Sequence, residues 1–227
     1  MSTKIWALMC ASGIWLAKIK GFITKAVYVA SAMGASQENV VSVPVHRPSL
    51  QEKLFFLLSG ILTSVPLTLF VGTFTDSLCV ALPIFYAQVC SVALFTPFVE
   101  EFAKAFPLFY RHCETTRSLF TLGFIVGLGF GFTEFLLYVF ALDQSIFVRL
   151  PAIFFHAAST SITAYGIGTN RPWLFYLVAV GLHFAINFAA FFPFSLWLLV
   201  GPTTLSVTYL LSWYLYKRTS ESLAGTV

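Results

Sequence analysis

Six apolar runs, each close to the length of a membrane-spanning helix, dominate this 227-residue chain. They cover residues 54–74, 79–109, 118–140, 147–169, 173–192 and 195–216. A helix needs about 20 apolar residues to cross the hydrocarbon core of a bilayer, because each residue adds about 1.5 Å. Backbone N–H and C=O groups find no water to bond there, so a spanning segment must form these hydrogen bonds within itself. We therefore expect an all-α, polytopic membrane bundle of about six transmembrane helices.

The composition supports a membrane protein. Hydrophobic residues make up 58% of the chain and charged residues 10%, against about 25% charged residues in a typical soluble domain. The net charge of +4 is small and lies in the loops, which argues against a nucleic-acid partner and for a lipid bilayer. The four cysteines are widely separated and form no C-x-x-C pair, so we expect small apolar helix residues rather than disulfides or zinc ligands. They are Cys10, Cys79, Cys90 and Cys113.

Four segments are expected along the chain. Residues 1–35 form an amphipathic N-terminal helix in the membrane interface, because Lys4, Lys18 and Lys25 would share one helical face. A signal-like leader is the alternative for this segment. The other segments are a polar linker (36–53), the membrane bundle (54–216) and a C-terminal tail (217–227).

The basic residues of the loops predict the orientation. They flank alternate ends of the apolar runs, so six spans place all these ends on one side of the membrane. The residues concerned are Arg47, Lys53, Arg111, Arg117, Arg171, Lys217 and Arg218. Because basic loops stay inside the cell, we expect a multi-pass protein of the cell membrane with a cytoplasmic linker and C-terminus.

Six ionisable residues interrupt the apolar runs and mark a functional site. An acidic residue at mid-bilayer costs roughly 2.5–3.5 kcal/mol, so each one calls for a specific role. At about 1.5 Å per residue, four different helices bring such groups to within about 10 Å of one depth. The residues are Glu100, Glu101, Lys104, Glu134, His156 and His183. A shared layer predicts that these side chains meet inside the bundle.

The i, i+4 neighbours of these residues are polar as well. Residues four apart lie on the same helical face, so each titratable group would have a hydrogen-bonding neighbour. The pairs are Glu100 with Lys104, Glu134 with Tyr138, His156 with Thr160, and His183 with Asn187. The lysine is expected to hold Glu100 charged. Gly123, Gly127 and Gly131 form a stripe that predicts close contact between the Glu134 helix and its neighbours, at the centre of the bundle.

Peptide-bond hydrolysis fits this set of groups. The reaction needs an activated water, a base and donors for the oxyanion. Glu100 or Glu101 could serve as the base, with Glu134 and His156 positioning the water. His183 and Asn187 would then donate to the oxyanion. A metal-dependent version is equally compatible, because two glutamates and two histidines could hold a divalent cation such as zinc. The chain lacks the H-E-x-x-H motif of one large class of zinc proteases.

Four short motifs resemble those of the PrsW-type intramembrane proteases. They occur in the family's order, on four successive predicted helices. The stretches are Glu100-Glu-Phe-Ala-Lys104, Phe130-Gly-Phe-Thr-Glu134 with Tyr138, Arg149 with His156 and Thr160, and His183-Phe-Ala-Ile-Asn187. The resemblance implies a multi-pass endopeptidase that cleaves membrane-associated proteins, anti-sigma factors being the substrates associated with the family. It also implies Glu100 as base, with His183 and Asn187 as oxyanion donors.

Related families and other functions give the alternatives. The CAAX prenyl endopeptidases and their relatives in bacteriocin immunity resemble this chain, but they carry a histidine where it has Glu134. A non-catalytic scaffold subunit could use the same bundle, although it would not need the second motif's carboxylate. Buried glutamates and histidines also form proton relays in cation-coupled transporters. Such transporters usually contain paired repeats, which this sequence does not show.

Overall fold

The computed structural model describes residues 47–110 and 115–221, and all statements below concern those residues. The interfacial or signal-like helix predicted for residues 1–35, and most of the linker predicted for residues 36–53, lie outside them. Helices make up almost all of the described part, which contains no β-strand.

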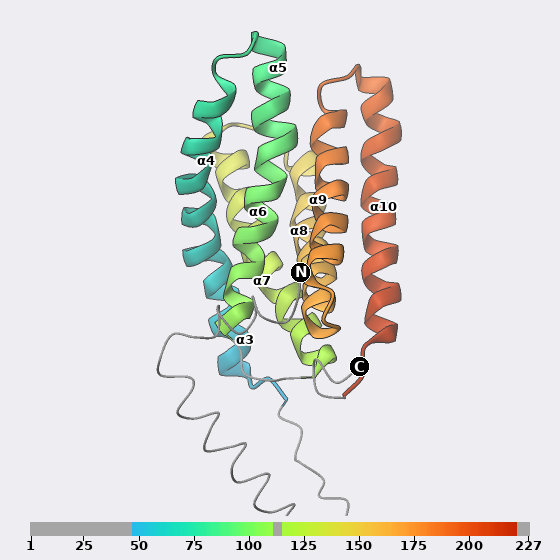
Figure 1. Ribbon diagram of the computed structural model, residues 1–227. Coiled ribbons are helices and arrows are strands. Elements are labelled where there is room, and N and C mark those ends of the chain that lie inside the picture. Colours follow the sequence, from blue (N-terminus) through green and yellow to red (C-terminus); the bar gives the residue numbers. More distant parts are fainter. Residues whose placement is uncertain (1–46, 111–114, 222–227) are drawn as a thin grey trace, which may run out of the picture. The chain divides into compact units, whose positions relative to one another are not determined.

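The helices form a bundle in which successive spans run up and down alternately (Figure 1). They are α3 (Leu50–Ser59), η1 (Gly60–Ser64), α4 (Val65–Cys79), α5 (Ile84–Gln88), η2 (Val89–Phe95), α6 (Thr96–Ala105), η3 (Phe106–Tyr110), α7 (Thr116–Leu136), η4 (Leu137–Ala141), α8 (Ile146–Gly168), α9 (Pro172–Ala189) and α10 (Phe194–Arg218). Elements that follow one another without a gap form one continuous helix, which is called a rod below. The elements α3, η1 and α4 thus form a single rod from Leu50 to Cys79.

Five of these rods are long and apolar enough to cross a membrane, which confirms the all-α polytopic bundle. The remaining predicted span, the second along the chain (79–109), is also helical from α5 through η3. It is not among these five rods, and it carries the charged residues Glu100, Glu101 and Lys104. The observed bounds lie within a few residues of most predicted ones. The first span is longer than predicted, because helix already begins at Leu50 and continues to Cys79. The second begins later, because Pro83 precedes its first helical residue.

Prolines account for two of the three π-helical segments. A proline inside a helix lacks an N–H group and its ring clashes with the carbonyl four residues earlier. Pro66 follows η1 and Pro97 follows η2, so in each case the wider π turn accommodates the preceding backbone. The segment η2 leads directly into α6, the helix that carries Glu100.

Helix α7 lies at the centre of the bundle because its glycines admit neighbours on two sides. A Cβ atom on Gly127 would lie 2.3 Å from the carbonyl oxygen of His156 in α8. On the other side of α7, a Cβ atom on Gly129 would lie 2.3 Å from the carbonyl oxygen of Leu57 in α3. The predicted role of the glycine stripe in helix packing is confirmed.

Replacing Gly127 by alanine is expected to destabilise the protein by about 1–3 kcal/mol, because the added methyl group overpacks the α7–α8 contact. Gly181→Ala is the matched control, since a Cβ atom there meets nothing within 4 Å. That change should be neutral or stabilising by about 0.5–1 kcal/mol, through the greater helix propensity of alanine. Thermal denaturation in detergent measures both. Equal melting temperatures for the two variants would contradict the close contact.

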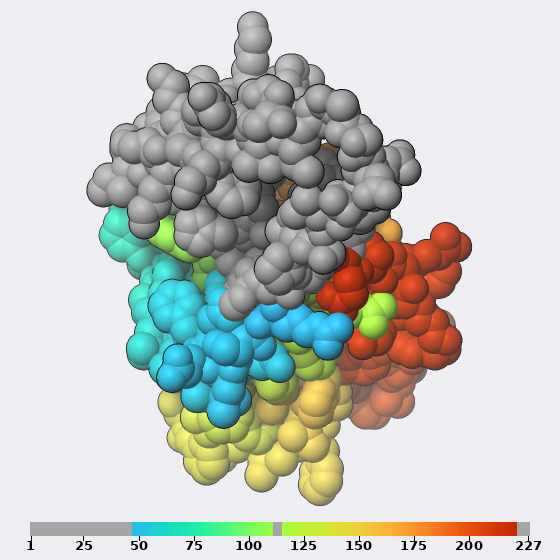
Figure 2. All heavy atoms as spheres, turned by 90° about the horizontal axis from the view of Figure 1, so that it is seen from below, coloured from blue at the N-terminus to red at the C-terminus, as the bar shows by residue number. Residues whose placement is uncertain are grey.

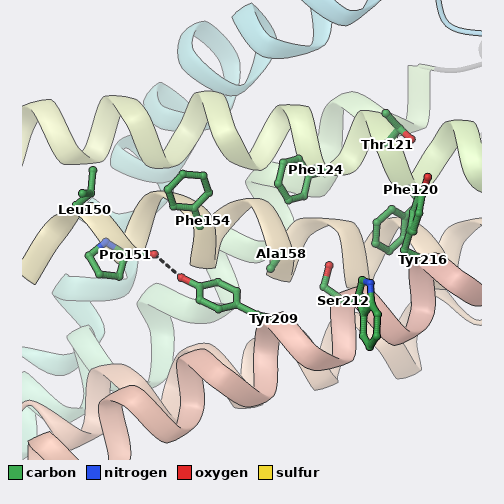
Figure 3. A pocket seen from close by; sticks show the side chains of 11 residues that line it. Phe120, Thr121, Phe124, Leu150, Pro151, Phe154, Ala158, Tyr209, Ser212 and Tyr216 are labelled. Atoms are coloured by element: carbon green, nitrogen blue, oxygen red, sulfur yellow. Dashed lines mark hydrogen bonds between the residues drawn. The ribbon is translucent and has the colours of Figure 1, made fainter.

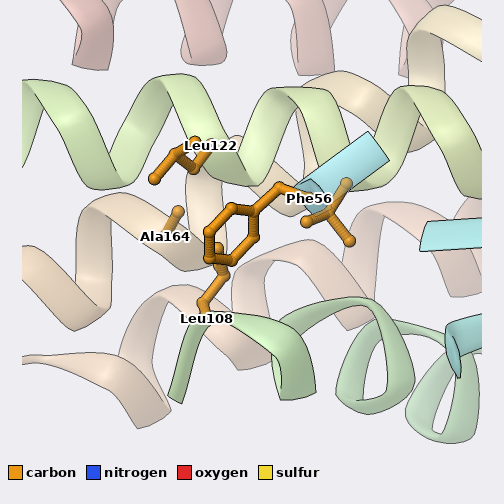
Figure 4. Packing of buried hydrophobic residues seen from close by; sticks show 5 residues of the cluster. Phe56, Leu108, Leu122 and Ala164 are labelled. Carbon is orange, nitrogen blue, oxygen red and sulfur yellow. The ribbon is translucent and has the colours of Figure 1, made fainter. Parts of the chain in front are cut away.

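An apolar cluster packs α3, η3, α7 and α8 together (Figure 4). Phe56, Leu108, Leu122, Val126 and Ala164 form this cluster, and each is at most 4% exposed. Many large apolar side chains of the same helices instead point outward, as expected for surfaces that face lipid. The core is therefore small, and the surface outside it is apolar.

The structure corrects the prediction for two cysteines. Cys79 at the end of α4 is disulfide-bonded to Cys90 in η2. The turn from Val80 to Pro83 reverses the chain, so the two residues come to lie beside each other with Cα atoms 5.8 Å apart. The hydroxyl of Ser91 donates a hydrogen bond to Asp76 across the same pair of helices. The bridge therefore joins the first two spans at the end where α4 turns into α5 (Figure 1).

The basic residues gather at the opposite end of the bundle. Helix α3 begins there and α10 ends there, as the view onto that end shows in blue and red (Figure 2). Lys53, Arg117, Arg171 and Lys217 all lie in the first or last turn of a helix, or next to it, at this end. The predicted segregation of basic residues to one end is present in the fold.

Candidate active site

Four helices bring the six predicted ionisable side chains together in the interior. Helix α6 carries Glu100, Glu101 and Lys104, while Glu134, His156 and His183 lie on α7, α8 and α9. All except Glu134 are buried. The imidazole rings of His156 and His183 have their centroids 5.3 Å apart. Residues far apart in the sequence therefore form one cluster, as their shared depth predicted.

Glu101 is the most connected member of the cluster. Its Oε1 atom lies 2.6 Å from Lys104 Nζ and 2.9 Å from His183 Nδ1. The hydroxyl of Ser159 donates to the same oxygen over 3.1 Å. The prediction that Lys104 pairs with Glu100 is corrected, because the lysine turns to Glu101, its i, i+3 neighbour. Glu101 thereby anchors side chains from three helices.

Lys104 connects the two histidines through this carboxylate. Its Nζ atom also lies 2.9 Å from His156 Nδ1, and it sits 5.1 Å from the centre of the Phe130 ring. An ammonium group only donates hydrogen bonds, so Nδ1 of His156 accepts one here. The proton of a neutral imidazole then lies on Nε2. Lys104 thus orients His156, and it is itself completely buried.

Glu134 completes the cluster from the α7 side. Its Oε2 atom lies 2.5 Å from His156 Nε2. The side chain of Glu134 is 17% exposed, whereas that of Glu100 is 8% exposed. Glu134 is therefore more exposed than Glu100, and it is aligned on the imidazole by a short hydrogen bond.

Glu100, His156 and His183 form a set that could hold a metal ion. Each offers one donor atom, and these atoms lie within 4.8 Å of one another. Glu100 Oε2 is buried without a hydrogen-bond partner, and it faces His183 Nε2 at 3.7 Å. Imidazole and carboxylate are the usual nitrogen and oxygen ligands of zinc. The residue types and the unpartnered oxygen both fit a divalent cation.

A histidine ligand normally donates its second N–H group to a carboxylate, which fixes the ring and its tautomer. The contact between His183 Nδ1 and Glu101 has this form, and it leaves Nε2 of His183 directed at Glu100. In His156 the protonated Nε2 atom faces Glu134, so this histidine would bind an ion only after Nε2 loses its proton and its contact with Glu134, and after Lys104 releases Nδ1 to carry the remaining proton. These changes would also release Glu134.

The supporting residues predicted from the i, i+4 spacing lie around the cluster rather than in it. The amide of Asn187 donates to the carbonyl of Val92 in η2. The hydroxyl of Thr160 bonds the backbone carbonyl of His156. Arg149 lies over the Tyr138 ring, 3.3 Å from its centre. These residues thus brace the helices that carry Glu134, His156 and His183.

Ser159 was not predicted as part of the site. It lies one turn after His156 on α8, and its hydroxyl reaches Glu101 as well as the carbonyl of His156. A polar residue at i+3 from an intramembrane histidine is a signal the sequence did contain. Three further small polar residues follow it on α8, and they do not contact Glu101, so the spacing alone could not single out Ser159.

Comparison with known proteins agrees with this arrangement. A family model described as PrsW family intramembrane metalloprotease matches residues 49–216, which include every residue of the cluster. No curated protein and no solved structure shows a significant match to the chain. The family match covers most of the chain and includes all or nearly all of each candidate membrane span in the described residues. This protein therefore belongs to the PrsW family of intramembrane metalloproteases.

Proposed function

We propose that this chain is a metal-dependent endopeptidase that hydrolyses peptide bonds of membrane proteins inside the bundle. The observation that carries the proposal is the convergence of Glu100, His156 and His183 within 4.8 Å, with Glu134 beside them. These groups come from four helices and are costly to bury, so a shared chemical role explains why they meet.

Glu100, His156 and His183 would hold the ion. Glu101 supports this role at His183, because it accepts the hydrogen bond from Nδ1 and leaves Nε2 for the ion. A divalent cation bound in such a site would make a water molecule more acidic and would polarise the scissile carbonyl. Glu100 and His183 already face each other before an ion arrives, whereas His156 would have to leave Glu134.

Glu134 would act as the general base and later as the acid. The sequence-based prediction gave Glu100 the role of base, but three observations favour Glu134. It lies outside the 4.8 Å ligand set, it is the most exposed carboxylate of the cluster, and it contacts His156 directly. A carboxylate beside the ligands can take a proton from the attacking water and return it to the leaving amine.

Asn187 keeps its proposed role as an oxyanion donor. A side-chain amide has two N–H groups, and the contact with Val92 uses one of them. The second N–H group remains for a substrate carbonyl. Asn187 lies one helical turn from His183 on α9, so both can face the same substrate segment.

The substrate class follows from the buried position of the site. A peptide bond reaches this layer only as part of a segment that enters the membrane, so we propose single-pass membrane proteins, anti-sigma factors among them. Co-expression with candidate single-pass proteins, followed by mass analysis of their fragments, tests the function. Wild-type protein should release two defined fragments that are absent with His183→Ala. Identical fragments from both would contradict a protease site at these residues.

We further propose that the linker before α3 and the C-terminus face the cytoplasm. The basic residues lie at that end, and the disulfide between Cys79 and Cys90 lies at the other, where an oxidising compartment would preserve it. In a variant with Ser in place of Cys10 and Cys113, a membrane-impermeant reductant added outside intact cells should make both remaining thiols available for labelling. Labelling of both thiols only after the membrane is opened would contradict the orientation, whereas labelling without reductant would contradict the disulfide.

A further inference from the structure

An apolar groove of about 830 Å³ runs along the outside of the bundle between α7, α8 and α10 (Figure 3). Aromatic side chains form its walls, and the small residues Ala158 and Ser212 lie in it. Its volume is within the range of small-molecule sites in proteins. Proteins rarely keep such a volume empty, and this groove opens on a surface that faces lipid.

The groove is separate from the cluster of Glu100, Glu134, His156 and His183. On α8 it is lined by Pro151, Phe154 and Ala158, which lie on one face of the helix. At about 100° per residue, His156 points about half a turn away from that face, toward α7 and α9. A substrate helix seated in the groove would thus be screened from the site by α8 itself. This argues against a path for substrate.

Three of the hydroxyl groups in the groove wall already form hydrogen bonds within the protein. The hydroxyl of Tyr209 donates to the carbonyl of Pro151, as the dashed line in Figure 3 shows. Ser212 bonds Ser161, and the hydroxyl of Thr121 bonds the carbonyl of Arg117 in its own helix. Because these hydroxyls already have partners, a hydrocarbon chain can lie against them at little cost.

The end of the groove nearest the end of α10 is basic. Lys217 Nζ lies 3.7 Å from the centre of the Trp213 ring, and Arg117 Cζ lies 4.9 Å from that of the Tyr216 ring. Both rings line the groove. Among the described residues, neither cation at this end of the groove has a carboxylate partner, and Arg117 is held in place because it donates to the hydroxyl and the carbonyl of Thr219.

We infer that the groove binds one anionic glycerophospholipid. Its hydrocarbon tail would fill the groove between α7, α8 and α10, and its phosphate would lie between Lys217 and Arg117. The chemistry of each part matches the ligand, because the walls are mainly apolar and aromatic while the rim carries the positive charges of Lys217 and Arg117. Interfacial cations and aromatic residues are the usual means by which membrane proteins hold anionic lipid headgroups. The inference does not depend on the proposed protease function.

Native mass spectrometry of the full-length protein tests the tail site. The protein is released from detergent in the presence of equal amounts of phosphatidylglycerol and phosphatidylcholine with the same acyl chains. Thr121→Trp places an indole in the groove and should lower the bound phospholipid by at least about fivefold. Thr203→Trp is the matched control, since Thr203 lies on α10 outside the groove and its hydroxyl also bonds its own helix. This variant should retain the lipid.

Lys217→Ala tests the headgroup site and cannot disturb the core, because Lys217 is exposed. The preference for phosphatidylglycerol should fall roughly fivefold, the effect expected for one basic residue near an anionic headgroup. Lys53→Ala, at the same end of the bundle but on α3, should leave the preference unchanged.

Several results would overturn the inference. Equal lipid binding by wild type and Thr121→Trp would show that the tail does not occupy this groove, provided that both proteins melt at the same temperature. An unchanged headgroup preference in Lys217→Ala would remove the phosphate site. Wild-type protein without any bound phospholipid would mean that another part of the chain, or a second copy, fills the groove.

Discussion

Replacing Glu100 by glutamine is expected to lower metal affinity by more than about 100-fold and to abolish cleavage. Loss of a residue that only supports a metal ligand costs about 10–100-fold, and Glu100 is proposed as a ligand itself. Its Oε2 atom is buried without a hydrogen-bond partner and faces His183. A neutral amide in the same place keeps the shape but loses the negative charge. Metal analysis of the purified protein and a cleavage assay in liposomes measure the two effects.

Glu52→Gln is the control for this prediction. Glu52 belongs to a capping box with Ser49 at the start of α3, and glutamine can form the same capping box. The control should retain its metal and its activity. If Glu100→Gln cleaved at the wild-type rate, Glu100 would be neither a ligand nor a base.

Replacing Lys104 by methionine is expected to destabilise the protein by about 3–5 kcal/mol. This is the usual cost of removing one partner from a buried ion pair, because the other charge then stays buried without compensation. Here that partner is Glu101, which is completely buried, and His156 loses a donor as well. Methionine has a similar length and adds no polar group, so packing changes little. The melting temperature in detergent, or the midpoint of denaturant unfolding, measures the loss.

The matched comparison removes both charges. A double variant, Glu101→Gln with Lys104→Met, leaves no unpaired charge and should recover part of the lost stability, as a double-mutant cycle would show. Lys53→Met, outside the core, should change stability by no more than about 0.5 kcal/mol. Purely additive effects of Glu101→Gln and Lys104→Met would mean that the two side chains do not interact.

Much of the fold could be predicted from the sequence because the bilayer leaves few choices. Uninterrupted apolar runs must become helices, so the bounds of α7, α8 and α10 lie close to the predicted ones. The cost of burying ionisable groups likewise predicted that Glu134, His156 and His183 would meet. Helical rise gave their depth, and the structure shows that they also face one another.

The partners within the cluster could not be predicted in the same way. Glu100 and Glu101 are adjacent, so they point about 100° apart on their helix. Only the rotation of α6 against its neighbours decides which carboxylate faces Lys104 and which stays unpartnered. The i, i+4 rule favoured Glu100 as the partner of Lys104, whereas in the structure Lys104 forms its ion pair with Glu101. Tertiary packing overrode a local preference that is weak in energy.

The disulfide escaped prediction for a related reason. Cys79 and Cys90 are 11 residues apart and lie within a single predicted span. The helix actually stops at Cys79 and resumes at Ile84, which folds one cysteine back toward the other. Pro83 lies directly before the second helix, but a proline by itself does not indicate that the chain reverses direction.

The most direct test of the proposed site is to measure metal content and substrate fragments on the same preparation of Glu134→Gln. Glu134 lies beside His156 but outside the proposed ligand set, so the two readouts should separate. The account predicts one bound divalent ion per chain, as in the wild type, and cleavage slowed by at least about 100-fold, as expected for loss of a general base. Cleavage at the wild-type rate, or a wild-type protein that cleaves without any bound metal, would contradict it.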